Sequence, residues 1–176
     1  MIRHGQTYAN LNKTYAGQTD IPLTEEGRRQ AEALRPILAG IHFDRVYSSD
    51  LSRAVDTQKL ALPGVEGTQL KVIREYDVGS LTGQAFRGVK SYEPYGGETT
   101  DTVCDRVREF LKILEADPCD RVAAFVHGGI VKCMLQVVLG VNYDRSSVIV
   151  DNCSIAVFEF KNDRWSMLAW NYMGEV

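Results

Sequence analysis

The sequence predicts a three-layer α/β domain, in which a mostly parallel central sheet is flanked by helices. Segments with the pattern of strands alternate along the chain with segments that have the pattern of helices, which is typical of this architecture. Residues 122–126 are apolar throughout, as expected for a strand that is buried on both faces. The length of 176 residues is about that of one domain. We therefore expect residues 1–176 to form a single domain.

The first half of the chain is expected to contain short strands separated by helices. Only two residues precede Arg3, so either the start of the chain is truncated or the first strand is a stub. Thr24 is the expected N-cap of the first long helix, and Pro36 is expected to bend that helix or end it early. In order, the predicted elements are the first strand, a helical turn at 7–11, the helix after Thr24, a strand at 43–47, a helix with Arg53 in its first turn, and a strand at 70–73.

The second half begins with an irregular, glycine-rich segment at 76–97 and then returns to regular elements. An apolar face predicts a helix that starts after Thr99 or Thr100 and ends at Asp117-Pro118. The helix after His127 carries apolar residues on nearly every side and is expected to be buried. The remaining predicted elements are the strand at 122–126, the helix at 130–139, and two strands at 154–160 and 165–170 that the turn Asn162-Asp163 joins into a hairpin at one edge of the sheet.

The composition excludes several classes of protein. The net charge is -3, from 20 basic and 23 acidic residues, which argues against a protein that binds nucleic acid through a general positive charge. No apolar run approaches the length that spans a membrane and no signal peptide is visible, so we expect a cytoplasmic protein without a membrane partner. The cysteines show neither the close pairs of a metal site nor a disulfide framework, and we expect them to be reduced. They are Cys104, Cys119, Cys133 and Cys153.

Five side chains with the chemistry of phosphoryl transfer stand at the ends of predicted strands or at the start of a helix. An arginine is a permanent cation whose fork of donors fits a phosphate, and a histidine can act as nucleophile, acid or base. A carboxylic acid can donate a proton to a leaving oxygen. Together these groups are sufficient to hold and transfer a phosphoryl group without a metal or another cofactor. They are Arg3, His4, Arg53, Glu75 and His127.

Each of these residues also has an ordinary structural interpretation. Arg53 could be a solvated helix arginine, although a cation in a first turn opposes the helix dipole and suggests that it faces an anion. Glu75 could be a carboxylate at a strand end that pairs with Arg74, and His127 could be a histidine satisfied within the fold. Asn10, in the first helical turn, is either a donor to phosphate or a residue that caps its own backbone.

Three motifs follow one another along the chain: Arg3-His4-Gly5, then Leu23-Thr24 with Gly27 and Gln30-Ala31, and finally Val126-His127-Gly128-Gly129. The first resembles the signature of the histidine phosphatase superfamily, in the branch that includes the cofactor-dependent phosphoglycerate mutases. The second resembles the first long helix of that family, and the third resembles its second histidine motif. The matches run in family order from end to end, so the resemblance implies the phosphoglycerate mutase-like fold.

The resemblance also implies a role for each residue of the site. His4 is expected to be the nucleophile and to form a phosphohistidine, and Glu75 is expected to act as general acid and then as general base. His127 is expected to be protonated and to stabilise charge on the transferring group. No metal and no other cofactor is expected. The predicted substrate-binding positions are Arg3, Asn10, Gly17, Arg53 and Gly128.

Two departures from the mutase pattern favour a phosphatase. Val78 and Phe86 stand where mutases place a Tyr and a Lys, and no Arg-Arg pair occurs between Glu75 and Gly97 to hold a second anionic group. Gly96-Gly97-Glu98-Thr99 resembles the Gly-Glu-Ser motif of phosphatase-like members. The segment that follows the acid is shorter than the cover of family phosphatases, which predicts a shallow pocket that tolerates bulky substrates. Its candidate rim residues, for which a solvated position is the ordinary interpretation, are Arg87, Lys90, Tyr92 and Tyr95.

The predicted function is hydrolysis of a phosphate monoester of a small metabolite, such as a sugar phosphate or a cobalamin-precursor phosphate, through a phosphohistidine. Phosphoglycerate mutase activity, a protein phosphohistidine phosphatase and a non-catalytic phosphate-binding module are the alternatives. The short cover suits a protein substrate, but minimal members of that kind tend to lack the acid that is present here as Glu75. A relative that had lost activity would be expected to lack one of the five side chains, and none is missing. The sequence gives no indication of the oligomeric state.

Overall fold

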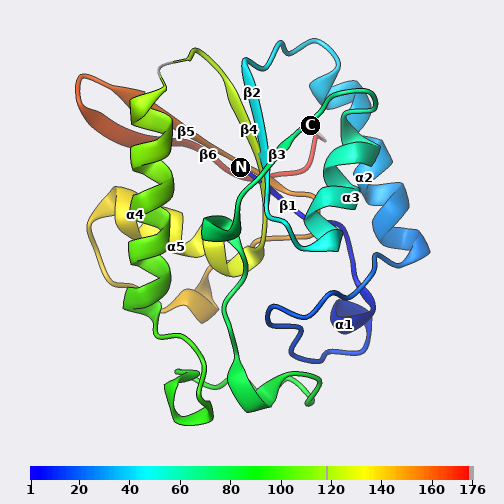
Figure 1. Ribbon diagram of the computed structural model, residues 1–176, viewed down its shortest axis with the longest axis vertical. Helices are drawn as coiled ribbons and strands as arrows, with labels where there is room; N and C mark the ends of the chain where they lie inside the picture. The colour runs from blue at the N-terminus through cyan, green and yellow to red at the C-terminus, as the bar shows by residue number, and fades with distance from the viewer. Residues whose placement is uncertain (118, 175–176) are drawn as a thin grey trace.

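A six-stranded sheet forms the centre of the molecule in the computed structural model, which describes residues 1–117 and 119–174 (Figure 1). The strands are β1 (Ile2–Arg3), β2 (Arg45–Ser48), β3 (Thr68–Gln69), β4 (Val122–Val126), β5 (Ile155–Lys161) and β6 (Arg164–Tyr172). Their order across the sheet is β3-β2-β4-β1-β5-β6. The first four in this order are parallel, whereas β5 and β6 are antiparallel. The sheet is therefore mostly parallel, as predicted.

Helices cover both faces of the sheet and complete the predicted three layers (Figure 1). On one face α2 and α3 pack against each other, and on the other face α4 packs against α5. Each face has its own apolar core, one built around residues of α4 and α5 and the other around residues of α2 and α3. The helices are α1 (Tyr8–Leu11), α2 (Glu25–Leu38), α3 (Ser52–Ala61), α4 (Thr100–Ala116) and α5 (Gly128–Leu139). No helix among the described residues is both long and apolar enough to cross a membrane.

The structure confirms the short first strand and the C-terminal hairpin. The strand β1 has two residues, yet it lies in the interior of the sheet between β4 and β5. The turn residues Asn162 and Asp163 both have positive φ angles, of 53° and 56°, which is the conformation that a two-residue hairpin turn requires. The four cysteines are free, as expected.

The strand predicted at 70–73 is wrong. The strand β3 lies earlier, at Thr68–Gln69, and Lys71–Ile73 forms a 3₁₀ helix. The last bond of the ladder joins the N–H of Leu70 to the carbonyl of Ser48, after which the chain turns away from this sheet edge. That turn buries Ile73 completely in the core on the α4 side. The apolar pattern of the segment therefore reflects packing under α4 and not a place in the sheet.

Two predictions about helices also need correction. Of the two effects predicted for Pro36, the early end of the helix is wrong, because α2 continues to Leu38. The ring of Pro36 is exposed, so the carbonyl that loses its helical partner can face water, while the buried Leu34 and Leu38 hold the helix on the core. In α5 only the first turns are buried, and Leu139 at its end is exposed. The helix α4 ends at Ala116; the predicted stop at Asp117-Pro118 lies partly outside the described residues.

The loop that follows β1 is held against the first turn of α2. The N–H of Gln6 donates to Oε1 of Gln30 at 2.9 Å, and the N–H of Thr24 donates to the carbonyl of Gln6 at 2.8 Å. The backbones approach so closely that a Cβ placed on Gly27 would overlap the carbonyl of Gln6. Gly5 faces the backbone of Gly27 in the same way, so both positions require a residue without a side chain.

We expect Gly27→Ala to lower the free energy of unfolding by about 1–3 kcal/mol, because the added methyl group must push two backbones apart. The measurement is urea denaturation followed by circular dichroism. Gly40→Ala is the matched control, since nothing lies within 4 Å of a Cβ at Gly40 and its φ is not positive. Equal midpoints for the two variants would contradict the close approach.

Candidate active site

The structure brings two histidines together at the carboxyl ends of neighbouring strands. His4 follows β1 and His127 follows β4, and the two strands are paired in parallel. The ring centroids lie 5.2 Å apart in an edge-to-face arrangement, and both residues are buried. Ligands of parallel α/β sheets bind at this end of the strands, so the pair marks the candidate site.

The hydrogen bonds of His4 define its tautomer. Its Nδ1 lies 2.7 Å from the carbonyl oxygen of Gly5, which can only accept, so Nδ1 carries the proton and Nε2 keeps a lone pair. Burial, followed by the charges of Arg53 and Arg3, holds the pKa of His4 well below its usual value of 6.5. The ring is therefore neutral near pH 7 and can act as a nucleophile through Nε2.

His127 has the opposite arrangement of donor and acceptor. Nε of Arg53 donates to its Nδ1 at 3.2 Å, so the neutral ring carries its proton on Nε2. Nε2 is buried and has no hydrogen-bond partner among the described residues. Burial, and then the charges of Arg53, His4 and Arg3, hold its pKa well below 6.5, so the expectation of a protonated His127 is wrong for this state of the protein. A neutral ring still offers Nε2–H to an oxygen of a ligand.

Arg53 is a buried residue, and its interpretation as a solvated helix arginine is excluded. Only 1% of its surface is exposed. Its Nη1 donates to the carbonyl of Thr19 and its Nη2 donates to that of Gly17, both at 2.8 Å. The carbonyl of Gly17 thus orients Arg53, which is a different contact from the direct substrate contact predicted for this glycine. The sequence indicated both Gly17 and Arg53 but not the contact between them.

Arg3 lies beside the same pair of rings and keeps one donor free. Its Nη1 donates to the carbonyl of Val150 at 2.5 Å, whereas its buried Nε has no partner among the described residues. A Cβ on Gly128 would lie 3.4 Å from this Nε, so the start of α5 packs directly on the guanidinium. Gly128 is therefore next to Arg3, where the backbone N–H groups of the helix start favour an anion.

Glu75 lies in the segment after the first 3₁₀ helix, and its side chain reaches the start of α5. Its carboxylate accepts the N–H of Tyr76 at 3.0 Å and the N–H of Gly129 at 3.1 Å. Burial raises its pKa, and this effect exceeds the lowering by the Gly129 N–H and by Arg53, Arg3 and Arg106. The alternative in which Glu75 pairs with Arg74 is wrong, because Arg74 forms two bonds of 2.6 Å with Asp50.

Asn10 has the capping role that one of its two interpretations predicted. Its Oδ1 accepts from the N–H and the hydroxyl of Thr7, both at 3.0 Å, and so completes the cap of α1. The same oxygen accepts from Nδ2 of Asn152 at 3.3 Å. The amide nitrogen of Asn10 is a donor only, and its use as a donor to phosphate stays a prediction.

Asn152 belongs to the site but was not predicted. Its Nδ2 donates to the carbonyl of His4 at 2.9 Å as well as to Asn10, so it links the first histidine to the first helical turn. A lone asparagine before the C-terminal hairpin has no pattern that would identify it in the sequence. A cleft of about 350 Å³ opens beside these residues. It is lined by Arg3, Ala9, Asn10, Lys13, Thr14, Phe86 and Asn152.

The segment 76–97 forms the rim of the site with a mixture of packed and exposed residues. Tyr92 packs edge-to-face on Tyr15 and Tyr76 at 5.9 and 5.5 Å, and burial raises its pKa to about 12, so it is not a solvated loop residue. The guanidinium of Arg87 lies 5.6 Å from the centre of the Tyr95 ring. Lys90 is exposed, in agreement with the ordinary interpretation.

The sequence profile of the histidine phosphatase superfamily (branch 1) matches residues 1–173. The chain belongs to the histidine phosphatase superfamily. It is 33% identical over 161 residues to a 2,3-bisphosphoglycerate-dependent phosphoglycerate mutase of Rhizobium etli, an alignment that covers 77% of each chain. It is 30% identical over 182 residues to a broad-specificity phosphatase of Saccharomyces cerevisiae, covering 93% of this chain and 79% of the relative. Its relatives thus include both phosphatases and mutases.

Solved structures of two phosphatases share the fold of this chain. A mycobacterial glucosyl-3-phosphoglycerate phosphatase in complex with VO3 is 26% identical, with a TM-score of 0.86 over 97% of this chain and 96% of its own. A phosphoserine phosphatase mutant of Entamoeba histolytica in complex with phosphoserine is 22% identical, with a TM-score of 0.88 over 98% and 95% of the two chains. The second likeness supports the fold alone.

The two buried histidines of this histidine phosphatase make its stability depend on pH. In the unfolded chain they bind protons near pH 6.5, whereas in the folded protein their pKa values lie well below that value. Below pH 6.5 the unfolded state therefore binds more protons, and the free energy of unfolding decreases as the pH falls. The slope is about 1.4 kcal/mol per pH unit for each histidine that stays neutral.

We expect His127→Gln to reduce this slope between pH 6.5 and 5.5, in urea unfolding measured at several pH values. His42→Gln is the control, because the side chain of His42 is 88% exposed. If both variants keep the slope of the wild type, His127 is not held neutral in the folded protein.

Proposed function

We propose that this protein is a phosphomonoester hydrolase that acts on small phosphorylated metabolites through a phosphohistidine at His4. The observation that carries the proposal is the hydrogen bonding of the two neighbouring rings. It leaves a lone pair on Nε2 of His4 and a donor on Nε2 of His127. A nucleophile next to a donor and two arginines has the parts that an in-line displacement at phosphorus requires.

In the first step, Nε2 of His4 attacks the phosphorus and the bond to the ester oxygen breaks. Glu75 gives its proton to that oxygen, which leaves as an alcohol. In the second step, water attacks the phosphorus of the phosphohistidine while Glu75 takes a proton from that water. The phosphorus–nitrogen bond breaks, the electron pair returns to His4, and inorganic phosphate is released. The raised pKa of Glu75 supports this sequence, because the group must hold a proton at the start of each cycle.

Fixed donors would stabilise the charge on the transferring group. Arg3 and Arg53 supply the two cations, and charge-assisted bonds from such groups are about twice as strong as neutral ones. Nε2–H of His127 and the amide nitrogen of Asn10 add neutral donors. The net charge of the whole chain is -3, so this attraction for phosphate is local to the site. We propose that these groups make a metal unnecessary.

Hydrolysis is favoured over phosphoryl transfer between metabolites because the two positions compared with the mutase pattern, Val78 and Phe86, carry apolar side chains, although Lys13 lines the cleft beside Arg3. Val78 is buried in the apolar core and Phe86 is a 60% exposed aromatic side chain that lines the cleft. Neither residue can bind a second phosphate. The broad-specificity phosphatase among the relatives agrees with an open cleft that accepts varied leaving groups.

We expect the wild-type protein to hydrolyse p-nitrophenyl phosphate in the presence of EDTA, and His4→Ala to lose at least about 10³-fold of this activity because the nucleophile is gone. The same variant should lose covalent labelling by a ³²P-labelled substrate. His42→Ala, a change of an exposed histidine, should keep both properties. Activity that disappears with EDTA, or an unaffected His4→Ala, would contradict the proposal.

We also expect incubation with 3-phosphoglycerate to yield inorganic phosphate and glycerate, with no 2-phosphoglycerate even when 2,3-bisphosphoglycerate is added. The reason is that few groups of the site could hold the bisphosphate intermediate while it reorients between the two phosphoryl transfers. The products are separated by ³¹P NMR. Interconversion of the two phosphoglycerates faster than phosphate release would favour the mutase instead.

A further inference from the structure

The segment that carries Glu75 has little regular structure of its own. It lies between two 3₁₀ helices, Lys71–Ile73 and Gly79–Leu81, and residues 74–78 belong to no helix or strand. Backbone ladders therefore do not fix the position of the carboxyl group. Its placement depends on hydrogen bonds that reach this segment from other parts of the chain.

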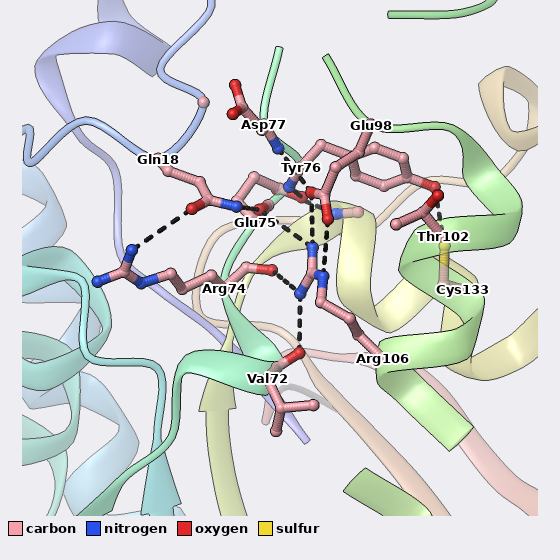
Figure 2. Close-up of polar contacts among 12 residues, drawn as sticks. Gln18, Val72, Arg74, Glu75, Tyr76, Asp77, Glu98, Thr102, Arg106 and Cys133 are labelled. Carbon is pink, nitrogen blue, oxygen red and sulfur yellow. Dashed lines mark hydrogen bonds and ion pairs between the residues drawn. The ribbon is translucent and has the colours of Figure 1, made fainter. Parts of the chain in front are cut away.

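One guanidinium from α4 makes three hydrogen bonds to the backbone at and just before Glu75 (Figure 2). Nη1 of Arg106 donates to the carbonyls of Val72 and Arg74, both at 2.8 Å. Its Nη2 reaches the carbonyl of Glu75 at 3.4 Å. A single planar group thus contacts three carbonyls within four consecutive residues, and a rigid fork of this kind sets their spacing.

The carboxylate of Glu98 holds the guanidinium from the other side (Figure 2). Its two oxygens accept from Nε and Nη2 of Arg106 at 2.9 and 2.8 Å. One of these oxygens also accepts the N–H of Asp77, and the N–H of Glu98 donates to the carbonyl of Asp77, both at 2.8 Å. Only 18% and 19% of the two side chains is exposed, so water competes little for this bidentate pair.

Together these contacts enclose Glu75. Arg106 binds the backbone at and before the acid, and Glu98 binds the residue two positions after it. On the opposite side, Nε2 of Gln18 donates to the carbonyl of Glu75 at 3.1 Å. Burial raises the pKa of Glu75, and the charge of Arg106 is among the influences that lower it, after the Gly129 N–H and Arg53 and Arg3.

We propose that Arg106 and Glu98 are positioning residues for the general acid: their ion pair fixes the backbone on both sides of Glu75 and so holds the carboxyl group at the leaving oxygen. Neither side chain touches the substrate. The inference rests on the proposed role of Glu75 as general acid. It assigns a function to the Gly96-Gly97-Glu98-Thr99 segment that is separate from substrate binding.

The test compares leaving groups in Arg106→Lys, Glu98→Gln and Glu75→Gln. An alkyl phosphate, glycerol 2-phosphate, needs a proton donor for its leaving oxygen, whereas p-nitrophenyl phosphate needs it much less. We expect Arg106→Lys and Glu98→Gln to lower kcat for the alkyl ester about tenfold more than kcat for the aryl ester, since a small displacement of the acid suffices for such losses. Arg108→Lys is the matched control, because Arg108 lies on the exposed side of the same helix and, among the described residues, forms an ion pair with Asp105 alone.

A pH profile separates positioning from general support of the fold. Arg106→Gln removes a cation near Glu75, which raises the pKa of the acid, so its protonated form persists to higher pH. The alkaline limb of kcat for the alkyl ester should therefore move upward in this variant and stay in place in Arg108→Gln. A purely structural role would lower the melting temperature without moving this limb.

Equal losses for both esters in Arg106→Lys and Glu98→Gln, with an unmoved limb, would overturn the inference. Glu75→Gln tells this result apart from failure of the proposed function. If Glu75→Gln itself shows no dependence on the leaving group, the acid assignment fails; if it shows a strong dependence that the other variants lack, only the positioning role fails. Should Arg106→Lys not fold, Glu98→Gln decides, because it keeps the shape of the side chain and removes only its charge.

Discussion

The site depends on a charge that the fold buries without a carboxylate partner. No ion pair among the described residues includes Arg53, whose donors go to two backbone carbonyls and to the ring of His127. A buried cation of this kind is costly unless an anion compensates it. Among the described residues, Nε of Arg3 and Nε2 of His127 are buried without a hydrogen-bond partner, as are the hydroxyls of Ser48 and Ser154. A bound anion would therefore compensate the charge of Arg53, next to the neutral imidazole that we propose as the nucleophile.

Burial and the charges of the arginines also determine which side chains of the site are protonated near neutral pH. Burial and neighbouring arginines keep both histidines neutral, whereas burial raises the pKa of Glu75 despite these arginines. Groups that differ in this way can serve as nucleophile and acid at one pH. In the proposed mechanism His127 acts as a neutral donor, since the bond from Arg53 fixes its tautomer. The arrangement explains how one small domain could combine attack, charge stabilisation and proton transfer without a separate acid for each step.

The sequence was sufficient to predict the fold and the residues with distinctive chemistry. His127 stands out because it follows an unbroken apolar strand, and His4 because Arg3 and Gly5 flank it. Local pattern could not predict contacts made by side chains from distant segments. Asn152 reaches His4 from 148 residues away, and the bonds of Arg106 to Val72 and Arg74 span 34 and 32 residues. The strand predicted at 70–73 is wrong for the same reason. The apolar side chain of Ile73 packs under α4, which is a contact with a distant segment. At Pro36, the packing of the neighbouring residues Leu34 and Leu38 on the core outweighs the tendency of proline to end a helix.

The most direct test of the account is to locate the phosphoryl group on the enzyme by ³¹P NMR, after the phosphoenzyme has been trapped with substrate and denatured in alkali. The bond from Nδ1 of His4 to the carbonyl of Gly5 leaves only Nε2 available, so the account predicts phosphorus on Nε2 of His4 alone. Phosphorus on Nδ1 of that ring, or on a different residue, would contradict it.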